Sequence, residues 1–129
     1  MSKLQLPQGL DTSSLFNLRV LLRYDKTYGV HVAHCIETGS IVTADTSDDA
    51  KNMIKELLED EIDFALKNGN LKNLFSSPAS LDVLVQWINA AQTKIDTEFL
   101  NVNLKEARLR EIEPKNTHLT NKLVFAKAA

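Results

Sequence analysis

Apolar and polar residues alternate along the first segment of the chain with a regular pattern. The apolar positions fall at every second residue from 16 to 22, and Arg19 and Arg23 lie among the positions between them. A period of two residues is typical of a β-strand that buries one face. Leu21 is the exception, because it is apolar on the otherwise polar face. The pattern predicts a strand over residues 16–23.

Two further short strands are predicted close behind the first. Residues 30–34 are rich in valine, and residues 41–44 form another short run that favours β-structure. Gly29 and Gly39 lie in the connections, where glycine can take the positive φ angles that tight turns need. Strands this close in sequence most simply form an antiparallel meander.

The clearest prediction is a long helix from Ser47 to about residue 68. Thr46 can cap its first turn, Asp48 and Asp49 lie near the positive end of its dipole, and Gly69 suits its end. Its apolar residues span an arc of roughly 220°, well over the ~100° stripe of an ordinary surface helix. They are Ala50, Met53, Ile54, Leu57, Leu58, Ile62, Phe64, Ala65 and Leu66. We therefore expect two covers for this helix, namely the sheet and either a second helix or another subunit.

The polar side of this helix carries a stripe of acidic residues. They are Glu56, Glu59, Asp60 and Asp63. Such a stripe is either a solvated helix face or a docking surface for a basic partner, such as an RNA-cleaving protein. Glu61 instead projects from the apolar arc, where an unpaired buried carboxylate is costly. We expect it to be buried in a packing interface and paired with Arg19, Arg23 or a subunit contact; the alternative is a catalytic carboxylate.

The second half of the chain has weaker signals. A second helix is predicted over residues 78–92, with Pro78 at its first position. A short strand is predicted around residues 100–104, and a poorly ordered tail follows Pro114. The predicted fold is α+β: a three-stranded antiparallel sheet packed by one long helix, followed by a second helix and a short strand or tail. We divide the chain into a leader (1–14), a domain (15–92) and a C-terminal extension (93–129).

Composition narrows the class of protein. The 129 residues are 43% hydrophobic and 25% charged, as in an ordinary globular protein, and the net charge is −2. A dedicated nucleic-acid binder usually has a basic excess. No apolar run reaches the ~20 residues that span a bilayer, and no signal-peptide core is present. The single cysteine, Cys35, cannot form an internal disulfide, so we expect a cytoplasmic protein.

No cluster of residues indicates a reaction, so we expect no enzyme, no metal and no cofactor. His31 and His34 point to opposite faces of a strand, and with Cys35 they are too crowded to close a tetrahedral metal site. The four glycines are scattered, which excludes a glycine-rich phosphate loop. A nuclease of RNase H type needs several carboxylates converging from strands, and the strands offer only Asp25 and Asp45.

Two short motifs resemble those of the HicB-like antitoxin family. Residues 30–37 (VHVAHCIE) resemble its strand motif, and residues 45–50 (DTSDDA) resemble the start of its helix. The similarity covers residues 15–69; Ala44 replaces a frequent glycine, and Asp48 and Asp49 replace a pair of glutamates. The resemblance implies a partly RNase H-like fold without its catalytic carboxylates.

The same resemblance implies a partner. HicB-like antitoxins cover a small RNA-cleaving HicA-type toxin, commonly as dimers or larger oligomers, and many carry a DNA-binding segment. Residues 99–106 are slightly similar to the strand of a ribbon-helix-helix, so DNA binding is possible but not evident. The alternative is a stand-alone oligomeric scaffold or ligand-binding protein without a toxin partner.

Overall fold

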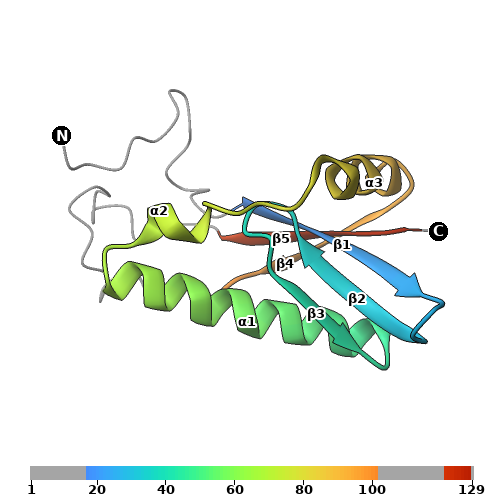
Figure 1. Cartoon of the computed structure of the whole chain (residues 1–129), viewed down its shortest axis with the longest axis horizontal. Helices are drawn as coiled ribbons and strands as arrows, with labels where there is room; N and C mark the ends of the chain where they lie inside the picture. Colours follow the sequence, from blue (N-terminus) through green and yellow to red (C-terminus); the bar gives the residue numbers. More distant parts are fainter. Residues whose placement is uncertain (1–16, 102–120, 129) are drawn as a thin grey trace.

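The computed structural model describes residues 17–101 and 121–128. Five strands form one mixed sheet in the order β3-β2-β1-β5-β4. Figure 1 shows three layers: the long helix α1 (Ser47–Lys67) lies against one face of the sheet, and α3 (Leu81–Ala91) lies against the other. The predicted α+β class is therefore confirmed, but the sheet has five strands and not three.

The predicted antiparallel meander is present. Strand β1 (Asn17–Asp25) pairs with β2 (Val30–Cys35), and β2 pairs with β3 (Ile41–Ala44). The Asp25 carboxylate accepts hydrogen bonds from the backbone N–H groups of Thr27 and Tyr28, at 2.9 and 3.3 Å, which closes the first turn.

The other two strands correct the prediction for the C-terminal part. Strand β4 (Ile95–Phe99) forms an edge, and β5 (Lys122–Lys127) lies between β4 and β1, parallel to β1. A tail after Pro114 was therefore the wrong prediction for residues 122–127. Strands β4 and β5 follow residue 93 and belong to the same sheet as β1, β2 and β3, so one sheet includes strands from both the predicted domain and the predicted extension. The predicted leader and the rest of the extension, 102–120, lie outside the described residues.

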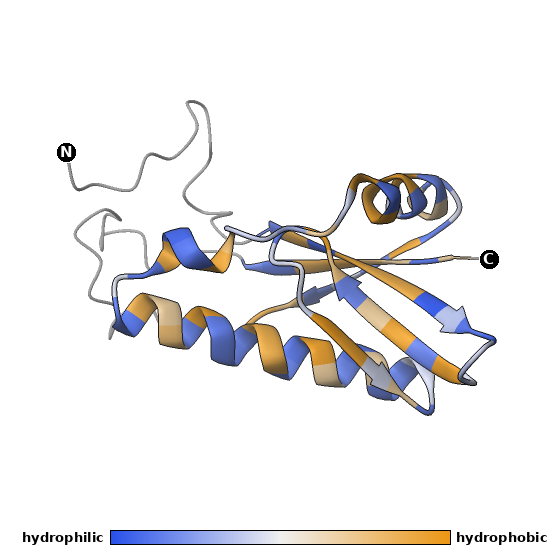
Figure 2. Ribbon diagram, in the orientation of Figure 1, coloured by the Kyte–Doolittle hydropathy of each residue, from blue (hydrophilic) through white to orange (hydrophobic). Residues whose placement is uncertain are grey.

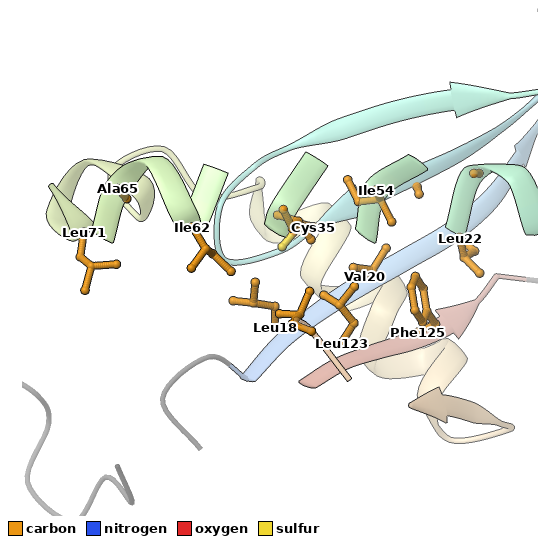
Figure 3. Close-up of a cluster of buried hydrophobic side chains, with 14 of the residues drawn as sticks. Leu18, Val20, Leu22, Cys35, Ile54, Ile62, Ala65, Leu71, Leu123 and Phe125 are labelled. Atoms are coloured by element: carbon orange, nitrogen blue, oxygen red, sulfur yellow. The ribbon is translucent and has the colours of Figure 1, made fainter. Parts of the chain in front are cut away.

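Helix α1 begins and ends where the sequence predicted. The Thr46 side chain accepts a hydrogen bond from the backbone N–H of Asp49 at 3.1 Å, and Gly69 takes a φ of 61° after the last turn. Its buried side packs against β1, β2 and β3, and apolar residues of β5 belong to the same core (Figure 3). The core residues labelled there are Leu18, Val20, Leu22, Cys35, Ile54, Ile62, Ala65, Leu71, Leu123 and Phe125.

Within the described chain, α1 has a second cover besides the sheet only at its C-terminal end. The short helix α2 (Leu71–Leu74) packs there and buries Leu71. Helix α3 does not cover α1, because it lies on the far side of the sheet (Figure 1). Met53 and Phe64, which widened the apolar arc, remain 45% and 66% exposed. The buried face of α1 is therefore narrower than the arc of apolar residues.

Helix α3 packs on β1 and β5 and starts later than predicted. It begins at Leu81 and not at Pro78, with Ser80 as its N-cap residue. The Trp87 indole N–H donates to the Val124 carbonyl at 3.2 Å, and the Arg19 guanidinium lies 5.5 Å from the centre of the Trp87 ring. These contacts hold the helix to the face opposite α1.

The linker between α2 and α3 crosses the turn that precedes β3. Gly39 has a φ of 76°, and a Cβ atom there would overlap the backbone carbonyl of Ser77. The Ala79 N–H donates to the Ile36 carbonyl at 2.9 Å. These contacts hold the linker on both sides of Pro78 in a non-helical conformation, so α3 begins only at Leu81. Within the described ranges, no helix is long and apolar enough to cross a membrane.

Candidate functional site

The predicted acidic stripe on α1 is only partly free for a partner. Glu59 accepts a hydrogen bond from the backbone N–H of Asn101 at 2.6 Å, and Asp63 forms an ion pair with Lys67 at 3.0 Å. Glu56 and Asp60 are exposed and form no ion pair with any other residue that the structure describes. The structure thus assigns two of the four carboxylates to contacts within the chain.

Glu61 is less buried than expected, and a hydrogen-bond network, not one of the expected arginines, pairs with it. It is half-buried, and its Oε1 accepts a hydrogen bond from the Ser40 hydroxyl at 2.6 Å. The Thr38 hydroxyl in turn donates to the Ser40 oxygen at 2.8 Å. The expected arginine partners are used elsewhere: Arg19 pairs with Glu37 at 2.6 Å, and Arg23 lies 4.0 Å from Asp25. The hydrogen-bond partner of Glu61 comes from the loop before β3, and a helical wheel of one segment cannot predict such a partner.

An open pocket lies between the C-terminal half of α1 and α2. Its volume is about 470 Å³. Carboxylates, carboxamides and apolar side chains line it together, and no lysine, arginine or histidine of the described residues does. The lining residues are Asp60, Glu61, Phe64, Ala65, Asn70, Asn73 and Leu74. A pocket with negative charge, carbonyl oxygens and an aromatic ring suits a cationic group.

A second pocket, of about 230 Å³, lies near the start of α1 and carries mixed charge. Lys51, Lys94 and Lys127 line it, together with Asp48 and Asp96. Although burial opposes it, hydrogen bonding and charge from Asp96 and from nearby Glu98 raise the pKa of Lys51. The Lys51 hydrogen bond lowers the pKa of Asp96. These pairs neutralise the best-placed lysine, so this pocket has no strong preference for an anion.

The residues around Cys35 do not form a site. His31 packs its ring 4.9 Å from that of Tyr24. His34 pairs with Leu21 in the sheet register, and burial followed by the charge of Arg23 lowers its pKa. Cys35 is buried in the core, and burial raises the pKa of its thiol. Among residues 17–101 and 121–128, no three His, Cys, Asp or Glu side chains are grouped to hold a metal ion.

The outer face of α3 is a feature that the sequence reasoning missed. Leu81, Val85 and Ile88 recur at helical spacing and are 72%, 46% and 43% exposed. Figure 2 shows hydrophobic residues recurring along the whole of this helix. The available signal was that α3 is apolar on two sides, which a single sheet cannot cover.

Comparison of the chain with protein-family models, with curated proteins and with solved structures gives no match.

Proposed function

We propose that this chain is a non-catalytic HicB-like module of antitoxin type, which binds and masks a small RNA-cleaving HicA-type toxin. The observation that carries the proposal is the acidic, hollowed surface of α1. Residues 56–63 contain five carboxylates, and two of them line the pocket against α2. The surface is therefore concave as well as charged, and this supports a docking surface over a solvated helix face.

The charge of this surface suits such a partner. An RNA-cleaving protein attracts phosphates with a basic surface, because neutralising phosphates supplies much of its affinity. An acidic surface on the antitoxin competes for the same basic groups and speeds association. The proposal thus needs no feature of the toxin beyond the charge that its substrate demands.

The roles of the motif residues also support the proposal. Cys35 is a buried core residue, Glu37 pairs with Arg19, and Thr46 caps α1. Each of these residues stabilises the fold, and none of them lies on the outward face of α1, which could therefore differ from one family member to another. The motif therefore fits a common scaffold with a variable binding surface.

The test is co-expression of the full chain with the small open reading frame beside its gene. We expect the neighbour alone to arrest growth, co-expression to restore growth, and the two chains to purify as a complex that NaCl weakens. A neighbour that is harmless alone and never co-purifies would overturn the proposal.

We also propose that the chain does not cleave RNA itself. Asp25, one of the two candidate carboxylates on the strands, closes the first turn and lies beside Arg23. It therefore has a structural role. Incubation of RNA with the purified chain and Mg²⁺ or Mn²⁺ should leave the RNA intact; metal-dependent cleavage that co-elutes with the chain would contradict this.

The second candidate function is a stand-alone homo-oligomer that uses the outer face of α3. The occupant of that face would be another copy of α3, since the helix carries a single charge, Asp82, and two copies would meet little repulsion. Light scattering should give a mass of at least two chains. Val85→Glu should reduce it to one chain, whereas the control Gln86→Glu, on the polar side of α3, should not. A wild-type mass of one chain would refute this candidate.

A further inference from the structure

We propose that the pocket between α1 and α2 binds an arginine side chain from a basic partner protein. The identity of that partner as a toxin rests on the function proposed above, whereas the arginine preference rests on the pocket alone. The pocket is the place where the acidic surface of α1 becomes concave, so it can accept one side chain.

Each polar side chain of the lining has at least one oxygen that can accept a hydrogen bond from a guanidinium. Asp60 is exposed and has no ion-pair partner among the described residues, and Glu61 uses one of its oxygens for Ser40. The carboxamide oxygens of Asn70 and Asn73 add two neutral acceptors. A guanidinium presents five donors in a planar fork, and it can bind a carboxylate and neighbouring acceptors together.

The apolar lining suits the rest of an arginine side chain. Phe64 contributes an aromatic ring, and this residue is 66% exposed. A guanidinium can stack on such a ring, and the methylene stem can pack against Ala65 and Leu74. Lysine has a compact, strongly hydrated charge, and it gains less from stacking and from a fork of acceptors.

The walls of the pocket are held in place before any partner arrives. The Asn70 N–H donates to the Ala65 carbonyl at 2.7 Å, and the Asn73 N–H donates to the Asn70 carbonyl at 3.1 Å. Leu71, between them, is buried in the core. On the other wall, the Ser40 hydroxyl orients Glu61. A preformed site loses little entropy on binding, which favours recognition of a single side chain.

The probe is an acetylated, amidated glycine–arginine–glycine peptide, titrated into the full ¹⁵N-labelled chain. We expect saturable shifts of the Asn70 and Asn73 side-chain amide signals, with a dissociation constant on the order of 1 mM. A citrulline peptide, which keeps the shape and lacks the charge, should bind at least ~10-fold more weakly, and a lysine peptide about threefold more weakly.

Isosteric variants test the lining residues. Asp60→Asn with Glu61→Gln removes two charges but keeps an acceptor for Ser40, and it should weaken the arginine peptide ~10-fold or more. Phe64→Ala should weaken it about threefold. The matched control is Glu56→Gln, which removes an exposed charge from the same helix outside the pocket; it should change binding less than about twofold. If the double variant fails to fold, Asp60→Asn alone carries the test.

Two results would overturn the inference. One is equal binding of the arginine and citrulline peptides; the other is equal weakening by Glu56→Gln and by the double variant. The outcome is separable from that of the proposed function. A co-purified neighbour that binds the double variant as tightly as the wild type removes the pocket proposal and leaves the antitoxin proposal. If the peptide binds at the pocket but no neighbour co-purifies, the pocket proposal stands and the antitoxin proposal is removed.

Discussion

Replacement of Gly39 by alanine is expected to destabilise the protein more than the same change at Gly29. Both glycines have positive φ angles, 76° and 64°, so both variants place a Cβ in the left-handed region. That strain costs about 1–2 kcal/mol, and the lower entropy of the unfolded alanine chain offsets about 0.4–1 kcal/mol of it. Gly29→Ala should therefore cost about 1 kcal/mol, because its Cβ would meet only the Tyr24 hydroxyl oxygen at 3.8 Å.

Gly39→Ala carries a second cost that Gly29→Ala does not. Its Cβ would overlap the Ser77 carbonyl, so the linker must move away from the turn. That movement endangers the hydrogen bond from Ala79 to Ile36, and the loss of a bond that leaves a buried group unpaired costs about 1–3 kcal/mol. We expect a total of about 2–4 kcal/mol for Gly39→Ala.

Urea denaturation followed by circular dichroism measures both variants. Hydrogen exchange at the Ala79 amide adds a local reading, since Gly39→Ala should speed it and Gly29→Ala should not. If the two variants differ by less than about 0.5 kcal/mol, which is close to the experimental resolution, the close approach of the linker to Gly39 does not stabilise the fold.

Three further changes have definite outcomes. Phe125→Ala should cost about 3–5 kcal/mol of stability, because Phe125 is buried in a central strand, whereas Phe64→Ala, at an exposed position, should cost less than about 1 kcal/mol. Equal costs of the two variants in urea denaturation would contradict the placement of β5. Thr46→Ala should cost about 1 kcal/mol and Thr46→Ser much less, since serine keeps the cap of α1; an unchanged thermal midpoint for Thr46→Ala would argue against the cap. Since burial lowers the pKa of His34, the unfolded chain binds more protons than the folded chain just below pH 6.5, and stability should fall as the pH drops through that range. His34→Gln should flatten the slope of stability against pH, and an identical slope in the variant would refute the assignment.

Local signals explain which parts of the fold the sequence could predict. The meander and α1 depend on alternation, turn residues and the Thr46 cap, all of which are contained in short segments. Strand β5 depends on a parallel pairing with β1 across about a hundred residues, and no local pattern encodes such a pairing. Its central position also covers both faces, so Val124, Phe125 and Ala126 form a continuous apolar run and do not alternate.

Strand β4 is a different kind of miss. Ile95, Thr97 and Phe99 alternate with Asp96 and Glu98, and this signal was present in the sequence. The acidic side of the strand faces α1, where Lys51 pairs with both acids and Lys55 with Glu98. Acidic residues are more typical of a loop than of the side of a strand that faces a helix, so Asp96 and Glu98 obscured the strand pattern. The strand predicted around residues 100–104 lies mostly outside the described residues, so β4 is a strand that the prediction missed.

The candidate site combines both kinds of signal. The acidic stripe could be predicted because charge and helical spacing are properties of one segment. The pocket could not, because α2 has only four residues and the partner of Glu61 comes from the loop before β3. Sequence reasoning therefore named Asp60 and Glu61 separately, but it did not predict the pocket that both of them line.

The two proposed surfaces are separated by the sheet itself. The pocket is lined by residues of α1 and of the α2 segment, whereas the exposed Leu81, Val85 and Ile88 belong to α3. Helices α1 and α3 lie on opposite sides of the sheet (Figure 1). Changes at well-separated sites without shared partners usually add. Self-association through α3 and capture of a basic partner at α1 are therefore compatible in one molecule. An oligomer built through α3 would present several copies of the acidic pocket, and a partner with several exposed arginines would gain avidity without any new contact.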